Sequence, residues 1–321
     1  MPRFPESIIN FNKTTRMHGD FPRIHRLGAV SPNGEASPFL WQGRMMRLEL
    51  SDPSRGLDPG VPITALIRDR GTGEVLSRFG EGCYYYSLYK DPAEDTVRVL
   101  GTKRGDVGFC GDTIMLFESR DLIHWDCREL LSRPGWKYYN TSLTRGPEGY
   151  VLLMEASHPA EEVGVPFTFF FAKSKDLINW EFLPAENAFS RNIYNGGPWM
   201  TYSRGYYYVI SVTALPFDRY TNYLYRTKDL RTWEVGFYNP ILSPSAEDRK
   251  VSPLACETES GWTKAIPDMF LASSSDMDLC DWPEKGKTLM VYLLGNQMGD
   301  YYMAEAEYDG SLADFLESYF N

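Results

Sequence analysis

Four acidic side chains adjoin apolar, strand-like runs and are the first candidates for acid/base chemistry. Glu155 ends the run YVLLM, and Glu35 precedes the run FLW with only small residues beside it. Asp276 and Asp278 alternate in the segment SSSDMDLC, so a strand would place both on one face. Burial beside apolar residues raises the pKa of an acid, and so does a neighbouring carboxylate. We therefore expect carboxyl groups with shifted pKa values at these positions.

Each of these acids also has a purely structural interpretation. Glu155 could be a strand-end side chain that reaches solvent, and Glu35 could be a turn residue. Asp276 and Asp278 could cap a turn or play a calcium-like role at the edge of a sheet. Glu155 remains the leading candidate because its run is otherwise uncharged.

An internal repeat indicates the scaffold that would carry these acids. The segments SRDLIHWD, SKDLINWE and TKDLRTWE follow strand-like runs, and their tryptophans Trp125, Trp180 and Trp233 are 55 and 53 residues apart (180 − 125 and 233 − 180). A Ser or Thr followed by Asp can bond nearby backbone amides and form a tight turn. Because the motif recurs, its aspartates are expected to be structural; these are Asp121, Asp176 and Asp229.

The runs between these turns predict about four short strands in each repeat. A four-stranded unit cannot bury both faces alone, so such units must stack around a common axis. We predict an all-β fold, a five-bladed β-propeller that forms a single domain over 1–321. The blades are expected at roughly 31–80, 81–133, 134–188, 189–240 and 241–310, with a loop or helical insertion near 243–275. A short C-terminal helix is expected after Ser311 as N-cap.

Composition excludes several classes of function. The net charge of −10 and the lack of a basic stripe disfavour nucleic-acid binding. No apolar stretch reaches 18 residues and the start has no signal-like apolar region, so we expect no membrane association and a cytoplasmic protein. Five scattered cysteines, four scattered histidines and the absence of GxGxxG, Walker, HExxH and GxSxG motifs give no metal-ligand pattern and no sign of a cofactor, so we expect neither. A metal ion on the axis is left open. A homo-oligomer is left open.

The repeated turn resembles that of the five-bladed propeller glycosidases, in particular glycoside hydrolase families 43, 32 and 117. The resemblance covers about 80–310 and implies three acids projecting into a funnel on the axis. Where the family has its first acid, this chain offers Glu35. Where the family has a mid-chain Asp-Pro, the chain has Asn140 followed by Thr141 and Ser142. In place of the later Glu-Gly-Pro it has Gly196-Gly197-Pro198.

The resemblance favours an exo-acting glycosidase that releases a terminal sugar from an oligosaccharide or glycoside. Cleavage of a glycosidic bond needs one protonated and one ionised carboxyl group. We expect Glu155 to be the general acid and Glu35, Asp276 or Asp278 to be the base. Polar groups that could bind sugar hydroxyls and aromatic groups that could stack on the ring are Asn140, Thr141, Ser142, His158, Asn296, Gln297, Trp41, Tyr194 and Trp199.

Two other functions fit the same fold. A propeller that kept the aromatic funnel but lost its hydrolytic acids would be a carbohydrate-binding module, as Asn140 and Gly196 at the motif positions suggest. A protein-interaction scaffold is the third hypothesis, and it requires a large exposed apolar patch.

Overall fold

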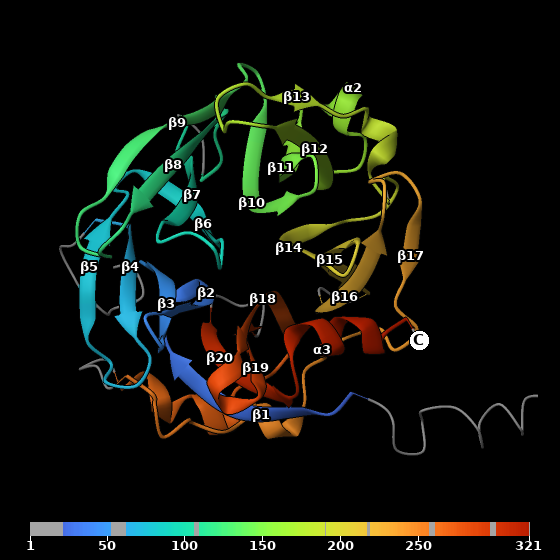
Figure 1. The fold of residues 1–321 in the computed structure, drawn as a ribbon. Coiled ribbons are helices and arrows are strands. Elements are labelled where there is room, and N and C mark those ends of the chain that lie inside the picture. Colours follow the sequence, from blue (N-terminus) through green and yellow to red (C-terminus); the bar gives the residue numbers. More distant parts are fainter. Residues whose placement is uncertain are drawn as a thin grey trace, which may run out of the picture.

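The chain forms a ring of five β-sheet blades around a central axis, each blade built of antiparallel strands (Figure 1). The computed structural model describes residues 22–52, 62–105, 109–189, 191–216, 219–256, 261–295 and 300–320. The predicted fold, an all-β five-bladed propeller with a short C-terminal helix, is therefore confirmed. The first four blades follow the chain outward from the axis, so the first strand of each is the innermost; in the fifth blade the innermost strand is Ser273–Trp282.

The first three blades are separate four-stranded sheets. Each has its strands in chain order, paired by successive hairpins. The strands are β2 (Gly34–Trp41), β3 (Arg44–Ser51), β4 (Thr64–Asp69) and β5 (Val75–Phe79) in the first blade; β6 (Cys83–Lys90), β7 (Val97–Lys103), β8 (Thr113–Ser119) and β9 (Asp126–Ser132) in the second; and β10 (Lys137–Gly146), β11 (Gly149–His158), β12 (Thr168–Ser174) and β13 (Glu181–Phe182) in the third.

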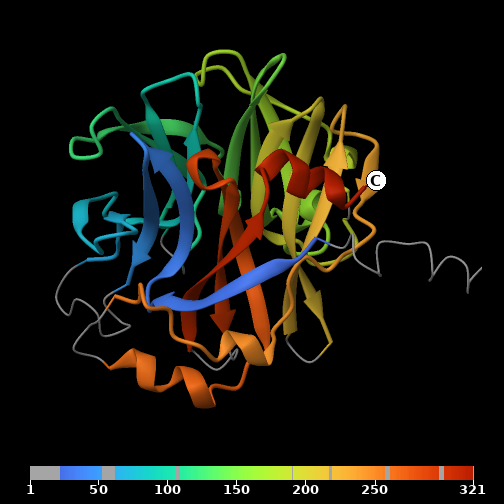
Figure 2. The same ribbon diagram turned by 60° about the horizontal axis from the view of Figure 1, so that its bottom comes forward.

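The fourth and fifth blades are joined into one eight-stranded sheet by a parallel bridge between Tyr220 and Ser273. The fifth blade takes its outermost strand from the start of the described chain, which closes the ring (Figure 2). The strands are β14 (Gly196–Ser203), β15 (Tyr206–Leu215), β16 (Arg219–Thr227) and β17 (Trp233–Val235), then β18 (Ser273–Trp282), β19 (Lys287–Gly295), β20 (Tyr301–Asp309) and β1 (Ile24–Ser31).

The hydrophobic core lies between successive blades. One cluster joins the first and second blades through residues such as Leu48 and Val99, and another joins the second and third through Leu116 and Leu152. Similar clusters follow between the third and fourth and between the fourth and fifth blades. Apolar burial of this kind holds the sheets together face to face.

The repeated turn has the structural role expected from the sequence. Ser119 Oγ accepts the amide of Leu122 at 2.9 Å, and Asp121 Oδ1 accepts the amides of Ile123 and His124 at 2.8 Å. The same bonds recur at Asp176 and Asp229. The ring of Trp125 stacks on Phe79 of the preceding blade with centroids 3.8 Å apart. The turns therefore fasten neighbouring blades to one another.

Short helices complete the ring. Helix α3 (Leu312–Ser318) begins after Ser311, whose Oγ accepts the amide of Asp314 at 3.2 Å, as predicted. A one-turn helix, α2 (Ala160–Val163), follows β11. The insertion expected near 243–275 contains the 3-10 turns η4 (Ala246–Asp248), η5 (Trp262–Lys264) and η6 (Ile266–Asp268), at the bottom of Figure 2. Within the described ranges no helix has the length and apolar character to cross a membrane.

Candidate active site

All five innermost strands are interrupted by a β-bulge near their first residues. The antiparallel register shifts between Gly34 and Ala36, Tyr84 and Ser87, Tyr138 and Thr141, Gly196 and Trp199, and Ser275 and Asp278. A bulge bends its strand and changes the direction of a side chain, and bulges are enriched beside active sites. The repetition places one irregular segment of every blade at the same end of the axis.

Several residues at these bulges have a left-handed backbone. The φ angles are 28° at Glu35, 55° at Tyr85, 50° at Gly197 and 47° at Asp276. Such φ values are uncommon for residues other than glycine and cost energy, and they concentrate at functional sites. Glu35, Tyr85 and Asp276 thus mark this end of the axis as the candidate site.

A narrow pit on the axis brings three of the four candidate acids together. Its free volume is about 20 Å³, which is room for about one water molecule. All five blades contribute to the wall of this pit through their innermost strands. The lining residues are Glu35, Ala36, Tyr86, Ser87, Asn140, Thr141, Gly197, Pro198, Asp276 and Asp278.

Glu155 lies beside this pit on β11, the second strand of the third blade, and is 3% exposed. Its Oε2 accepts the side-chain amide of Asn140 and the backbone amide of Gly197, both at 3.0 Å. Burial raises the pKa of Glu155 to about 8, with Asp276 adding to the rise and the two amides opposing it. The carboxyl group is therefore protonated at neutral pH.

Gly196 and Gly197 have no Cβ, and this leaves room for the carboxyl groups of Glu155 and Asp276. A Cβ at Gly196 would lie 2.6 Å from Tyr194 Oη and 3.1 Å from Glu155 Oε1. A Cβ at Gly197 would collide with Asp276 Oδ1. The glycines at the motif position thus allow Glu155 and Asp276 to approach the inner strand of the fourth blade from its two sides.

Asp276 and Asp278 both reach the pit, although a bulge lies between them. Both aspartates are half-buried. Burial raises the pKa of Asp278 to about 7; Asp276 adds to the rise, and the Ser37 hydroxyl, which donates to Asp278 Oδ2, opposes it. Burial also raises the pKa of Asp276. Asp276 and Asp278 are therefore neighbouring acids that both have a raised pKa.

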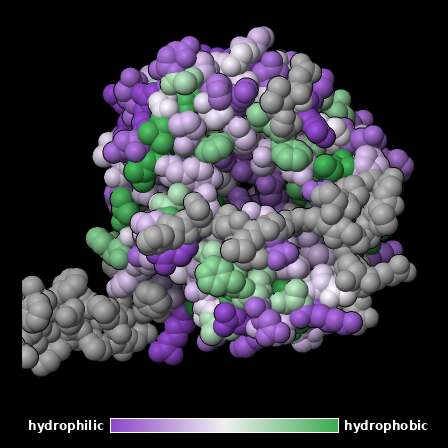
Figure 3. All heavy atoms as spheres, turned by 180° about the vertical axis from the view of Figure 1, so that it is seen from behind, coloured by the Kyte–Doolittle hydropathy of each residue, from purple (hydrophilic) through white to green (hydrophobic). Residues whose placement is uncertain are grey.

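An arc of aromatic rings adjoins the acids. Tyr85 and Tyr139 are 5.5 Å apart between centroids, Tyr139 and Phe167 4.7 Å, Phe167 and Tyr194 5.3 Å, and Tyr194 and Tyr220 5.5 Å. Burial, together with the nearby acids, raises the pKa of Tyr85 and Tyr194 above the usual range, so both phenols keep their protons. On this side the ring is hollowed at its centre, and hydrophilic residues line the hollow (Figure 3).

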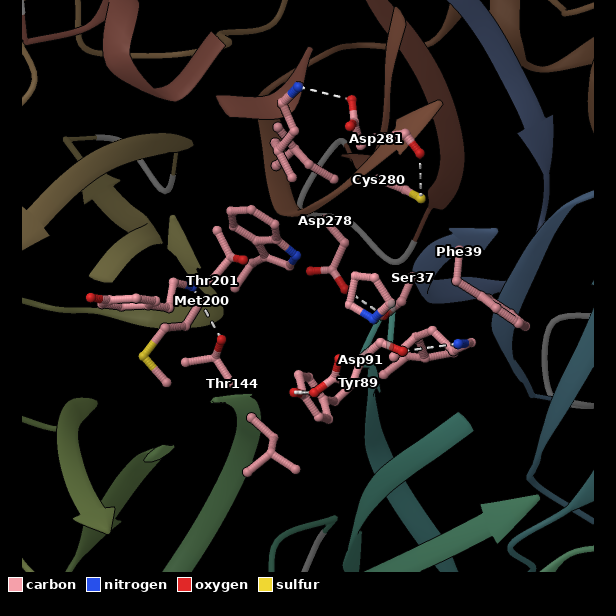
Figure 4. A pocket seen from close by; sticks show the side chains of 18 of the residues that line it. Ser37, Phe39, Tyr89, Asp91, Thr144, Met200, Thr201, Asp278, Cys280 and Asp281 are labelled. Carbon is pink, nitrogen blue, oxygen red and sulfur yellow. Dashed lines mark hydrogen bonds between the residues drawn. The ribbon is translucent and has the colours of Figure 1, made fainter. Parts of the chain in front are cut away.

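A second, larger cavity occupies the other end of the axis. Its volume is about 800 Å³, and the later parts of all five inner strands line it. Asp278 and Ser37 line it as well, and in Figure 4 both point toward its centre. Asp278 thus stands between the pit and this cavity.

Other residues named from the sequence lie away from the pit. Trp41 is 9% exposed and packs in the core between the first two blades, because its side chain falls on the interblade face of β2. Trp199 lines the larger cavity. Ser142 Oγ accepts the amide of Met200 at 2.9 Å and fastens β10 to β14. His158 is exposed at the end of β11, paired with Ser157.

Asn296 and Gln297 fall outside the described residues. Of the remaining candidates, Asn140 and Thr141 line the pit, and Tyr194 belongs to the aromatic arc. Tyr85, Tyr139 and Phe167 were not recognised from the sequence. Aligning the inner strands by their repeat spacing would have placed Tyr85 beside Glu35 and Asn140. Over the described ranges, His, Cys, Asp and Glu side chains form no group of three or more able to hold a metal ion.

Comparisons with known proteins identify the fold. No protein-family model matches, and no curated protein does. A thermostable family-43 glycoside hydrolase is 12% identical with a TM-score of 0.61, over 87% of this chain and 90% of that one. A mutant of the GH43 protein BlXynB of Bacillus licheniformis is 14% identical with a TM-score of 0.56, over 88% of this chain and 54% of its own.

The GH32 β-fructofuranosidase BmSUC1 of Bombyx mori is 12% identical with a TM-score of 0.55, over 94% of this chain and 64% of its own. The present chain spans about half the length of BlXynB. The fold is therefore that of the five-bladed propellers of glycoside hydrolase families 43 and 32. At these identities the likeness is one of fold alone. The resemblance to family 117 stays a prediction.

Proposed function

We propose that this protein is a glycoside hydrolase that removes a terminal sugar, with Glu155 as its general acid. The observation that carries the proposal is the arrangement around Gly197. A buried carboxyl group with a pKa of about 8 lies on one side of this glycine, and Asp276, at the pit, lies on the other. One proton donor and a group of further acids around one axis is the set that glycosidic cleavage requires.

In the proposed reaction, Glu155 gives its proton to the glycosidic oxygen. The bond between that oxygen and the anomeric carbon breaks, and its electron pair leaves with the oxygen. A water molecule attacks the anomeric carbon and passes a proton to an ionised carboxylate. Glu35 is our first candidate for this base, and Asp276 and Asp278 are the alternatives. The water-sized pit between these three acids supports such a position for the water.

The shape of the axis supports an exo mode. A pit with room for about one water cannot admit a sugar ring. A glycan would therefore end at the pit and extend outward past the aromatic arc, whose rings can stack on sugar faces. Only the terminal residue would reach the acids.

Hydrolysis of a panel of synthetic glycosides by wild type and Glu155→Gln tests the proposal. The wild type is expected to release one terminal sugar, and the variant is expected to lose turnover while it still folds and binds the same sugar. Full activity of Glu155→Gln would remove this residue from the mechanism.

A non-catalytic carbohydrate-binding propeller is the second candidate. It is favoured by Asn140 and Gly196, which stand where the resembling families have acids. Thermal stabilisation of the wild type by a sugar, with no product from any glycoside of the panel, would support binding alone.

A further inference from the structure

A buried ion cluster lies where the first and last blades meet. Arg47 donates to Glu49 at 2.9 Å and to Glu305 at 2.8 Å. Arg68 donates to Glu49 at 3.1 Å, and Arg70 pairs with Glu305 at 2.9 Å. Arg47 is 1% exposed, and both glutamates are 0% exposed. Because buried charges are costly unless they are paired, the cluster holds its members in a defined geometry.

The cluster joins two ends of the ring. Arg47, Glu49 and Arg68 belong to β3 and β4 of the first blade, whereas Glu305 belongs to β20 of the fifth. Between these blades the chain crosses from β1 into β2.

Glu49 also binds the segment that makes this crossing. Its Oε2 accepts the side-chain amide of Asn33 at 2.7 Å and the Ser31 hydroxyl at 3.3 Å. The backbone amide of Asn33 donates to the same hydroxyl at 3.2 Å. Asn33 is 2% exposed and precedes Glu35 by two residues. The contacts that close the ring therefore fix the chain immediately before Glu35.

We propose that Glu49 is a positioning residue for Glu35, which it holds at the pit through Asn33. The proposal rests on the function proposed above. Oε1 of Glu49 accepts hydrogen bonds from Arg47 and Arg68, so Oε2 of Glu49 is a fixed acceptor for the crossing segment. Burial would raise the pKa of Glu49, but the two guanidinium groups and the Asn33 amide outweigh it, so the pKa lies below its ordinary value. The acceptor thus stays ionised in neutral solution.

The requirement for a fixed segment is geometric. Glu35 has a φ of 28°, a conformation that its surroundings must impose. A shift of roughly 1 Å in a reacting group can cost about 100-fold in rate. Loss of the Asn33 contact would let the turn relax and withdraw the Glu35 carboxyl group from the pit.

Three full-length variants test this role. Asn33→Ala removes the hydrogen bond between Asn33 and Glu49 and leaves the ion pairs of Glu49 in place. Glu49→Gln weakens both this hydrogen bond and the ion pairs. Glu305→Gln is the matched control, because Glu305 is equally buried and also binds Arg47, whereas the Asn33 side chain binds Glu49. We expect Asn33→Ala and Glu49→Gln to lower kcat by about 10- to 100-fold with KM changed by less than about 3-fold. Glu305→Gln is expected to lower Tm but to keep kcat within about 3-fold.

Crystal structures of Asn33→Ala and Glu305→Gln give a readout that does not depend on activity. Displacement of the Glu35 carboxyl group by about 1 Å or more in Asn33→Ala alone is expected. Glu35 in its wild-type position in Asn33→Ala would overturn the proposal, and so would equal losses of kcat in Asn33→Ala and Glu305→Gln. If the wild type hydrolyses no glycoside, the proposed function fails, yet the crystal structures still decide whether Glu49 positions Glu35.

Discussion

Glu155 Oε2 accepts the backbone amide of Gly197 at 3.0 Å, which joins the second strand of the third blade to the innermost strand of the fourth. The same oxygen accepts the Asn140 amide, so Oε1 is left for the proton. Oε1 faces the space that a side chain at position 196 would fill. The proton donor thus reaches the fourth blade from the neighbouring third blade.

The Glu155→Gln defect should depend on the leaving group. Without its general acid, the enzyme must expel an unprotonated oxygen, which is harder for a poor leaving group. We expect a loss of about 100- to 10,000-fold on alkyl or sugar leaving groups and a much smaller loss on nitrophenyl glycosides. Steady-state kinetics over a series of leaving groups measures this. Glu148→Gln, which changes an exposed acid on the loop before β11, is the control. A loss that is equal for all leaving groups would argue against a proton-donating role.

Stability should fall as pH rises, because of Glu155. Its pKa is about 8 in the folded chain against an ordinary value of 4.5, so between these values the folded state holds a proton that the unfolded state has lost. Wild-type stability therefore decreases from about pH 5 to about pH 8, and Asp278, with a pKa near 7, acts in the same direction.

Glu155→Gln removes the larger of these two contributions to the pH dependence of stability. The Tm of the variant minus that of wild type is expected to increase from pH 5 to pH 8, as scanning calorimetry would show. A Tm difference that is constant over this range would mean that Glu155 has an ordinary pKa in the folded protein.

Gly197→Ala should destabilise the protein and impair the site. The substitution places a Cβ against Asp276 Oδ1 at a φ of 50°. The control Gly205→Ala introduces the same kind of strain at a φ of 85° with no atom within 4 Å. We expect about 1–2 kcal/mol from the backbone in both variants and about 1–3 kcal/mol more at Gly197. Urea unfolding measures the difference, and equal values would show that Asp276 does not pack on this glycine.

Removal of the base should be separable from removal of the acid. Glu35→Ala is expected to lose about 100- to 10,000-fold in rate, with partial recovery when azide or formate occupies the vacated space. Asp276→Ala and Asp278→Ala are tested in parallel under the same conditions. Recovery in an aspartate variant but not in Glu35→Ala would transfer the role of base to that aspartate.

The sequence was sufficient for the fold because the scaffold signals are local. Each turn with Asp121, Asp176 or Asp229 bonds only its own neighbours, and the spacing of Trp125, Trp180 and Trp233 records the period of the ring. Strand β1 was not anticipated as part of the fifth blade. Its pairing with β20 joins opposite ends of the chain, and no local pattern encodes it.

The site was only partly predictable, for a related reason. Glu155, Asp276 and Asp278 became candidates because acids beside apolar runs are few, and they lie at or beside one pit; their catalytic roles stay a prediction. Tyr85 was missed although the repeat spacing aligns it with Glu35 and Asn140, because the bulge and the positive φ at this position leave no mark in composition. Trp41 was expected at a sugar, but large aromatic residues of a propeller serve equally well between blades.

Infrared titration of Glu155 tests the account most directly. The carbonyl band of a protonated carboxyl group, obtained as wild type minus Glu155→Gln, would be followed from pH 5 to pH 9. We predict that the band persists at pH 7 and disappears around pH 8. Its absence at pH 7, with Glu155 already ionised, would contradict the assignment of this residue as the proton donor.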